Sequence, residues 1–166
     1  MLKDYTVCFF GHRRIENFCQ ADARTEKLIR RLIQTKDTIE FLVGREGEYD
    51  QIVSSAVRRV RKLYSEGQCW LTWVLPYPKA ELENNKTYFQ TYYDSIEICD
   101  ASTLLHPKAA IQARNRNLVD RSDLCVFFVE RQSGGAWATM RYALRQRKKV
   151  VNLAREDDED IIIPQS

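Results

Sequence analysis

The sequence predicts a single α/β domain of three layers with a mainly parallel sheet. Short runs of apolar, β-favouring residues alternate along the 166 residues with stretches whose apolar residues recur at helical spacing. Three of the predicted strands end on glycines, at Gly11, Gly44 and Gly134-Gly135. Because right-handed crossovers place the carboxyl ends of parallel strands along one edge, we expect these three turns to meet where ligands of such sheets bind.

The first half of the chain supports this class. Helices are expected between the strands because apolar residues repeat at intervals of three and four. The first helix is expected to be capped by Asp22 or Thr25, and the second to begin near Asp50. We expect strands here at residues 6–10, 38–43 and 68–75.

The second half continues the alternation after an irregular stretch. Residues 76–94 contain two prolines and no clear periodicity, so we expect a loop with one short helix. The expected strands here are residues 95–99, 124–129 and 150–153, and the expected helices are residues 107–121 and 136–146. Residues 155–166 form a C-terminal tail, in which residues 161–163 are expected to add an edge strand.

Composition limits the class of protein. The chain is 44% hydrophobic and 30% charged, as in an ordinary globular domain covering residues 1–166. A net charge of +3 is too small to indicate nucleic acid by itself. There is no signal-peptide pattern and no apolar run of about 20 residues. We therefore expect a cytoplasmic protein that does not span a membrane.

The cysteines and histidines give no sign of a metal centre. The cysteines are odd in number and form no C-x-x-C pair, which favours buried free thiols in a reducing compartment. With only two histidines in the chain, a structural zinc site is not expected, and no cofactor is predicted. The five cysteines are Cys8, Cys19, Cys69, Cys99 and Cys125.

The strongest local pattern is a strand, a glycine turn and a helix start. Ser133-Gly134-Gly135 follows the apolar run 124–129 and precedes a helical pattern. The first N–H groups of a helix are unpaired and favour an anion, and glycine lets a ligand approach the backbone. We interpret the turn as a phosphate site, with a tight connection as the alternative. Trp137 beside it either stacks on a base or packs in the core.

Two common nucleotide motifs are missing. No G-x-G-x-x-G follows the first strand, and no G-x-x-x-x-G-K-[ST] occurs in the chain. The expected ligand site is therefore neither a dinucleotide fingerprint nor a P-loop.

Four segments, taken in order, resemble those of one known family. Residues 10–13 resemble a Thr-Gly-His-Arg turn, residues 44–50 a glycine-rich G-x-D segment, residues 114–123 an R-N-R-x-M-V-D-x-S-D run, and residues 134–143 a G-G-T…Y-A turn and helix. The chain thereby resembles the SLOG superfamily, whose Rossmann-like members are related to LOG phosphoribohydrolases and to the DNA-processing protein DprA. Its motifs are most similar to the YspA/YpsA-like branch. The resemblance implies a nucleotide-derivative site at the strand edge, with Gly134-Gly135 at a phosphate.

The resemblance does not extend to the catalytic acid of LOG enzymes. Those enzymes carry a P-G-G-x-G-T-x-x-E turn, and an upstream arginine assists its glutamate in N-glycosidic cleavage. Here Trp137 and Ala138 replace the Gly-Thr pair, while Met140 and Arg141 stand where the glutamate would fall. Arg114 does match the arginine. The pattern argues against LOG-type hydrolysis and leaves binding intact.

Candidate contacts follow the first two glycine turns. Arg13 and Arg14 present guanidinium groups suited to a phosphate, with surface ion pairs as the alternative. His12 is either an acid or base or a structural turn residue. Asp50 either caps the next helix or contacts a ribose hydroxyl. Glu48 is the acid nearest to the second turn and the candidate there for replacing the missing glutamate.

Other candidates belong to the helix predicted before the last glycine turn. Arg114 and Arg116 are two residues apart and cannot face the same way, and family position favours Arg114. Asn117 is a further candidate ligand contact. Asp120 either caps the helix or pairs with an arginine, or it acts on the ligand as a second candidate acid.

Three functions are weighed against these residues. The first is binding of a nucleotide or nucleotide-derived small molecule, as a sensor or sequestering protein. The second is a nucleotide N-glycosidic hydrolase, which needs Glu48 or Asp120 within reach of the ribose. The third is DprA-like binding of single-stranded DNA, against which the small net charge argues. The family analogy also suggests a homodimer.

Overall fold

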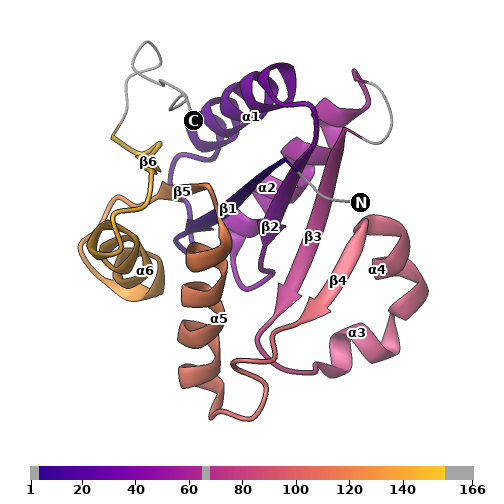
Figure 1. Cartoon of the computed structure of the whole chain (residues 1–166), viewed down its shortest axis with the longest axis vertical. Coiled ribbons are helices and arrows are strands. Elements are labelled where there is room, and N and C mark those ends of the chain that lie inside the picture. Colours follow the sequence, from indigo (N-terminus) through magenta and orange to yellow (C-terminus); the bar gives the residue numbers. More distant parts are fainter. Residues whose placement is uncertain (1–3, 65–67, 156–166) are drawn as a thin grey trace.

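A six-stranded parallel sheet forms the centre of the molecule (Figure 1). The computed structural model describes residues 4–64 and 68–155, so the expected edge strand at residues 161–163 lies outside the described residues. Sheet order is β4-β3-β2-β1-β5-β6, and every pairing is parallel. The strands are β1 (Tyr5–Gly11), β2 (Ile39–Val43), β3 (Cys69–Leu75), β4 (Ser95–Ile98), β5 (Leu124–Phe128) and β6 (Val150–Asn152).

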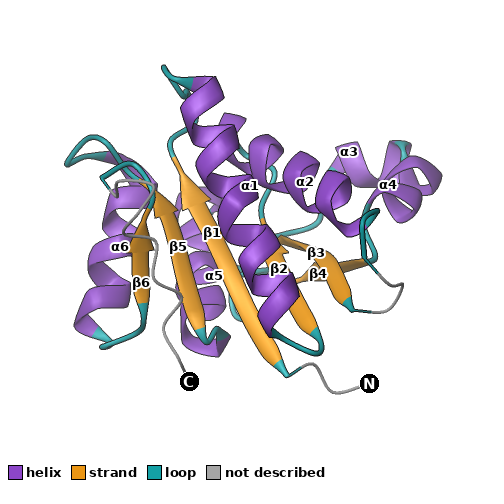
Figure 2. Cartoon of the chain, turned by 90° about the horizontal axis from the view of Figure 1, so that it is seen from above, coloured by secondary structure: helices purple, strands orange, loops and turns teal. Residues whose placement is uncertain are grey.

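Helices cover both faces of this sheet and complete the three layers. Helices α1 to α4 lie on one face, and α5 and α6 lie on the other (Figure 2). The central strands are apolar on both sides because both sides are covered. The helices are α1 (Phe18–Thr35), α2 (Glu48–Arg61), α3 (Ala80–Asn84), α4 (Lys86–Tyr92), α5 (Pro107–Arg121) and α6 (Gly134–Arg145). The predicted three-layer Rossmann-like fold is confirmed.

At the start of α1 and over residues 76–94, the structure differs from the prediction for local reasons. Helix α1 begins one turn or more before the expected caps, because the Asn17 side chain accepts the N–H of Gln20 at 3.1 Å. Thr25 is buried inside the helix, where its hydroxyl lies 3.0 Å from that of Tyr49. Residues 76–94 contain two short helices, α3 and α4, where one was expected.

The described residues contain no helix that is both long and apolar enough to cross a lipid bilayer.

The chain reverses its direction across the sheet at β1. Strands β2, β3 and β4 extend to one side of β1, and the chain then returns through α5 to place β5 on the other side. Gly11 at the end of β1 pairs with Phe128 at the end of β5. Ligands of open α/β sheets bind at such a reversal, outside the carboxyl ends of the strands. The fold therefore positions a site between the loops that follow β1, β2 and β5.

Candidate functional site

A cleft of about 520 Å³ lies at this reversal. Its walls come from the loops after β1, β2 and β5 and from the first turns of α5 and α6. All three glycine turns of the sequence line it, as the parallel sheet requires. The volume is within the range of small-molecule sites.

Most of the predicted ligand contacts are brought together in this cleft. Those that line it are Gly11, His12, Arg13, Gly44, Asp50, Arg114, Ser133, Gly134 and Gly135.

Five predicted site residues do not line the cleft. The Glu48 carboxylate instead accepts the N–H of Ile15 at 2.6 Å and ties the loop after β1 to α2. The Asp120 carboxylate accepts the Tyr142 hydroxyl at 2.7 Å, between α5 and α6. Trp137 packs against the core on that side of the sheet, under the guanidinium of Arg141. Asn117 and Arg14 also lie outside the cleft lining.

The first turn of α6 is arranged to receive an anion. Ser133 is the N-cap, and its side chain makes no capping hydrogen bond. No acidic residue lies in the first turn of the helix, and Gly134 and Gly135 are exposed. Gly134 has φ of +88°, a conformation that glycine adopts without strain. The helix therefore begins at Gly134 rather than at residue 136 as predicted, with its first N–H groups toward the cleft.

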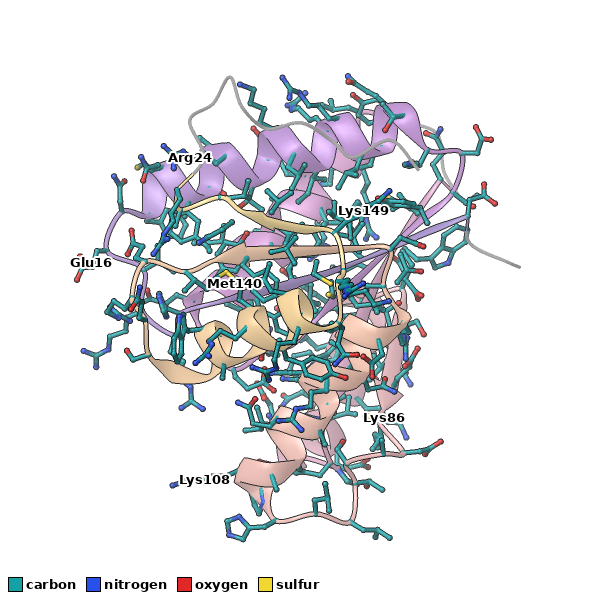
Figure 3. The ribbon with its side chains drawn as sticks, turned by 60° about the vertical axis from the view of Figure 1, so that its left-hand side comes forward. Glu16, Arg24, Lys86, Lys108, Met140 and Lys149 are labelled. Carbon is teal, nitrogen blue, oxygen red and sulfur yellow. The ribbon has the colours of Figure 1, made fainter. Side chains whose placement is uncertain are left out.

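Three exposed cationic residues lie around this turn. Arg13 follows β1, Arg131 precedes the glycines, and Lys108 extends from the first turn of α5 (Figure 3). All three line the cleft together with the α6 N-terminus. Arg131, Lys108 and the helix dipole make the α6 side of the cleft positive, and Arg13 lies between it and the α2 side, where its Cα packs against Gly47.

The N-terminus of α2, at the same edge of the sheet, is already occupied by the protein. Asp50 is the third residue of α2, and its carboxylate accepts the N–H of Glu46 at 2.9 Å and that of Gly47. Glu48 donates its own N–H to the Arg13 carbonyl at 2.9 Å. The α2 N-cap is Gly47, so the predicted capping role of Asp50 is realised from inside the helix rather than from the N-cap. Of these two helix starts, α6 is the one suited to an external anion.

Arg114 fixes the opposite half of the cleft. Its side chain is only 3% exposed and donates to the Glu46 carboxylate at 3.1 Å and to the Val74 carbonyl at 2.7 Å. Its Nε donates to the Asn115 side chain at 3.0 Å. Arg116 points outward from the same helix, as predicted from the spacing.

A chain of hydrogen bonds joins Arg114 to the glycine turn. The Asn115 amide donates to the Thr139 hydroxyl at 3.2 Å, and that hydroxyl donates to the Gly135 carbonyl at 2.8 Å. Asn115 and Thr139 are both buried. The two halves of the cleft are therefore held in a fixed relation by buried polar contacts.

Glu46 and Asp50 form a pair of acids in the cleft wall with opposite pKa shifts. Burial would raise the pKa of Glu46, but the charge and hydrogen bond of Arg114, with the charge of Lys79, outweigh it and lower the pKa. Burial and the neighbouring Glu46 charge raise the pKa of Asp50 to about 7, against the opposing effects of two backbone N–H groups and Arg114. Near neutral pH, Glu46 is thus ionised while Asp50 exchanges a proton.

His12 has a structural position in the floor of the cleft. It is buried, and its Nε2 accepts the N–H groups of Glu130 at 3.0 Å and Arg131 at 3.2 Å. Burial and the charge of Arg131 lower the pKa of His12, despite the opposing charge of Glu130. The neutral ring therefore carries its proton on Nδ1 and holds the loop that leads to the glycine turn.

Two glycines in the cleft wall are required by close packing. A Cβ on Gly11 would lie 2.3 Å from the ring of Tyr49, which is fully buried beneath it. A Cβ on Gly47 would lie 2.6 Å from the Arg13 Cα. These glycines bring the loops after β1 and β2 against each other and so shape the cleft.

Sequence reasoning missed several residues that line the cleft. Glu46 is the most important, because it is the acid that Arg114 binds. Its place between Gly44 and Gly47 marks the loop as a site, but Glu48 is equally a neighbour of Gly47, so the sequence does not tell the two acids apart. The other missed lining residues are Phe10, Gly47, Lys108, Ile111, Gln112, Asn115, Arg131 and Ala136.

Among the described residues no group of three or more His, Cys, Asp or Glu side chains is placed to hold a metal ion.

Comparison with known proteins identifies the fold and no closer relationship. No family model matches the chain, and no curated protein matches it. Two solved structures of DNA processing protein A do match, those from Helicobacter pylori and Streptococcus pneumoniae. The first, described for its single-stranded DNA binding mode, is 17% identical with a TM-score of 0.60, and the second is 18% identical with a TM-score of 0.62.

The shared region is a part of each of those proteins. It covers 89% and 88% of this chain, but 64% of the Helicobacter chain and 49% of the Streptococcus chain. At these identities the similarity shows the fold alone. The chain has the Rossmann-like fold of these two DNA processing protein A structures.

Proposed function

We propose that this protein binds a phosphorylated, nucleotide-derived small molecule, as a sensor or sequestering protein. The observation that carries the proposal is the uncapped α6 N-terminus at Gly134-Gly135, which opens on a cleft that Arg13, Lys108 and Arg131 also line. The phosphate would accept hydrogen bonds from the first N–H groups of α6, with Arg13, Lys108 and Arg131 neutralising its charge. The resemblance of residues 134–143 to the YspA/YpsA-like branch implies a phosphate at the same turn and supports the proposal.

Native mass spectrometry with adenosine monophosphate tests this proposal. The wild-type protein is expected to retain one nucleotide per chain, and Gly135→Leu to lose it because the new side chain projects into the turn. Ala138→Leu is the matched control, since Ala138 is exposed on the same helix and does not line the cleft. Equal retention of the nucleotide by wild type and Gly135→Leu would contradict phosphate binding at Gly134-Gly135.

Hydrolysis of an N-glycosidic bond is a second candidate at the same site. The two acids weighed from the sequence lie outside the cleft, but Glu46 and Asp50 line it. With its pKa raised to about 7, Asp50 is suited to pass its proton to the leaving base nitrogen as the C1′–N bond breaks. Water would add its oxygen to C1′ and return a proton to the Asp50 carboxylate, which balances the reaction.

Chromatography of the same incubations tests this second candidate. Free adenine and ribose 5-phosphate in equal amounts are expected from wild type if it is a hydrolase, and none from Asp50→Asn. Nucleotide recovered intact from a stable complex would leave binding alone as the function.

Single-stranded nucleic acid is a third ligand class, and the charge distribution favours testing it. Residues 107–149 contain ten Lys or Arg and three Asp or Glu, so they carry +7 in a chain whose net charge is +3. Arg116 lies over the ring of Tyr142 and Arg141 over that of Trp137 on the outer side of α5 and α6. If this face binds an oligonucleotide, fluorescence anisotropy of a labelled oligothymidine should show binding that weakens steeply with salt.

A further inference from the structure

The cleft has two chemically different halves. The half at Gly134-Gly135 is positive and lacks acidic groups in its first helical turn. The other half contains two acids, Glu46 and Asp50, which lie four residues apart around the start of α2. A ligand that fills the cleft must therefore satisfy an anion site at one end and a pair of carboxyl groups at the other.

The acid pair is nearly neutral as a unit, so it does not select a cation. Glu46 is paired with Arg114 at 3.1 Å and lies 3.6 Å from Lys79. The other charged or titratable groups facing Asp50 are Arg114 from α5 and Glu46, with the buried Tyr49 beside it on α2. Asp50 carries a proton up to about neutral pH, and that proton gives the pair one hydrogen-bond donor beside several acceptor oxygens.

A donor beside acceptors is the arrangement that matches neighbouring hydroxyl groups. Each hydroxyl can donate one hydrogen bond and accept others, so two adjacent hydroxyls can bond both carboxyl groups. The buried chain through Asn115 and Thr139 fixes this acid pair relative to the phosphate turn. The spacing of the two halves is therefore preorganised for one small ligand.

We propose that Glu46 and Asp50 hold the vicinal hydroxyl groups of a phosphorylated ribose and so discriminate ribose from 2-deoxyribose. The inference rests on the proposed phosphate site at Gly134-Gly135 and names what the rest of the cleft recognises. Asp50 acts as donor and Glu46 as acceptor. A deoxy sugar lacks one of the two hydroxyl groups and so loses its hydrogen bonds to this acid pair, and the loss of a hydrogen bond in a polar site lowers affinity.

Isothermal titration calorimetry with three probes tests the inference: ribose 5-phosphate, 2-deoxyribose 5-phosphate and inorganic phosphate. At about pH 6 we expect ribose 5-phosphate to bind at least about ten-fold more tightly than the deoxy sugar. The ratio of the two affinities, ribose 5-phosphate over 2-deoxyribose 5-phosphate, is expected to fall above about pH 7, as Asp50 loses its proton. The phosphate groups of the two sugars titrate alike, so their ionisation cancels in the ratio.

Two variants separate a role in recognition from a structural one. Asp50→Asn keeps a neutral donor and acceptor at the same place, so it should keep the discrimination and lose its pH dependence. Asp50→Ala removes the donor, so the ratio should fall to about one while both sugars still bind.

The outcomes distinguish this inference from the function on which it rests. Equal binding of the two sugars to wild type at about pH 6, or a ratio that does not change with pH, overturns the role of the acid pair while phosphate binding stands. Failure of all three probes to bind overturns both the phosphate site and the inference.

Discussion

The guanidinium of Arg114 donates a hydrogen bond to the carboxylate of Glu46 at 3.1 Å, although the two residues are 68 positions apart in the chain. Arg114 is 3% exposed and the Glu46 side chain 15% exposed. The contact joins α5 to the loop after β2 and fixes one wall of the cleft. Removal of one partner from a buried ion pair destabilises the fold, because the charge of the other partner is left buried without compensation.

Removal of Arg114 should therefore destabilise the fold strongly. We expect Arg114→Met to lower the free energy of unfolding by about 3–5 kcal/mol, since Glu46 and the Val74 carbonyl lose their donor. Adding Glu46→Gln should return about 1–2 kcal/mol, because it removes a largely buried charge that only Lys79, at 3.6 Å, still offsets. Urea unfolding of the two single variants and the double variant measures this. Additive effects of the two changes would show that the pair is not coupled.

Asp50 should make stability fall as the pH rises. Its pKa is about 7 in the folded protein and about 3.8 without the surrounding structure, so the folded state binds the extra proton between these values. The contribution of Asp50 to the free energy of unfolding is largest at about pH 4 and below. It decreases as the pH rises toward 7 and no longer changes above that pH. Asp50→Asn should consequently gain thermal stability over wild type with rising pH. Melting curves of wild type and variant that stay parallel across this range would contradict the assignment.

Protonation of His12 at low pH should change the chemical shifts of two backbone amides. Because its pKa is lowered from 6.5, the folded protein resists protonation, and stability falls as the pH drops below about 6.5 toward the folded pKa. Protonation turns Nε2 into a donor and breaks its bonds from Glu130 and Arg131. We expect the amide resonances of these two residues to shift together with a midpoint below 6.5. A midpoint above that value, or unrelated shifts, would place His12 in another role.

Two glycines of the cleft should differ sharply in their tolerance of alanine. Gly11→Ala places its Cβ 2.3 Å from the ring of Tyr49, which is buried and stacked on Phe128, so we expect a loss of about 1–3 kcal/mol. Gly135→Ala approaches only the mobile end of Gln112 at 3.2 Å and should cost less than about 0.5 kcal/mol. Chemical denaturation of both variants decides the order. Equal costs would mean that Tyr49 can move aside.

The fold was predictable because its signals are local and repeated. The six strands are short apolar runs, and α2, α5 and α6 follow from spacing and from punctuation by proline or glycine. The two short helices α3 and α4 were not predicted separately, because five and seven residues are too few to show a helical hydrophobic period. Asn17 could have been found, since Asn followed three residues later by Gln20 is a capping pattern.

The position of the site could be predicted from the glycine turns. The side-chain contacts inside it could not, because they depend on distances in the folded protein. Parallel strands bring the turns at Gly11, Gly44 and Gly134 to one edge by necessity. Glu46 and Glu48 differ by two loop positions, and no spacing rule tells which one a buried arginine on α5 will reach. The structure places Glu46 against Arg114 and turns Glu48 toward Ile15.

The most direct measurement is a titration of isotopically labelled protein with inorganic phosphate, followed by amide chemical shifts. We expect saturable shifts that are largest at Gly134, Gly135 and Ala136, that are lost in Gly135→Leu and that are kept in Ala138→Leu. Saturable shifts confined to other parts of the chain, or no saturable shift, would contradict the phosphate site on which the proposed function depends.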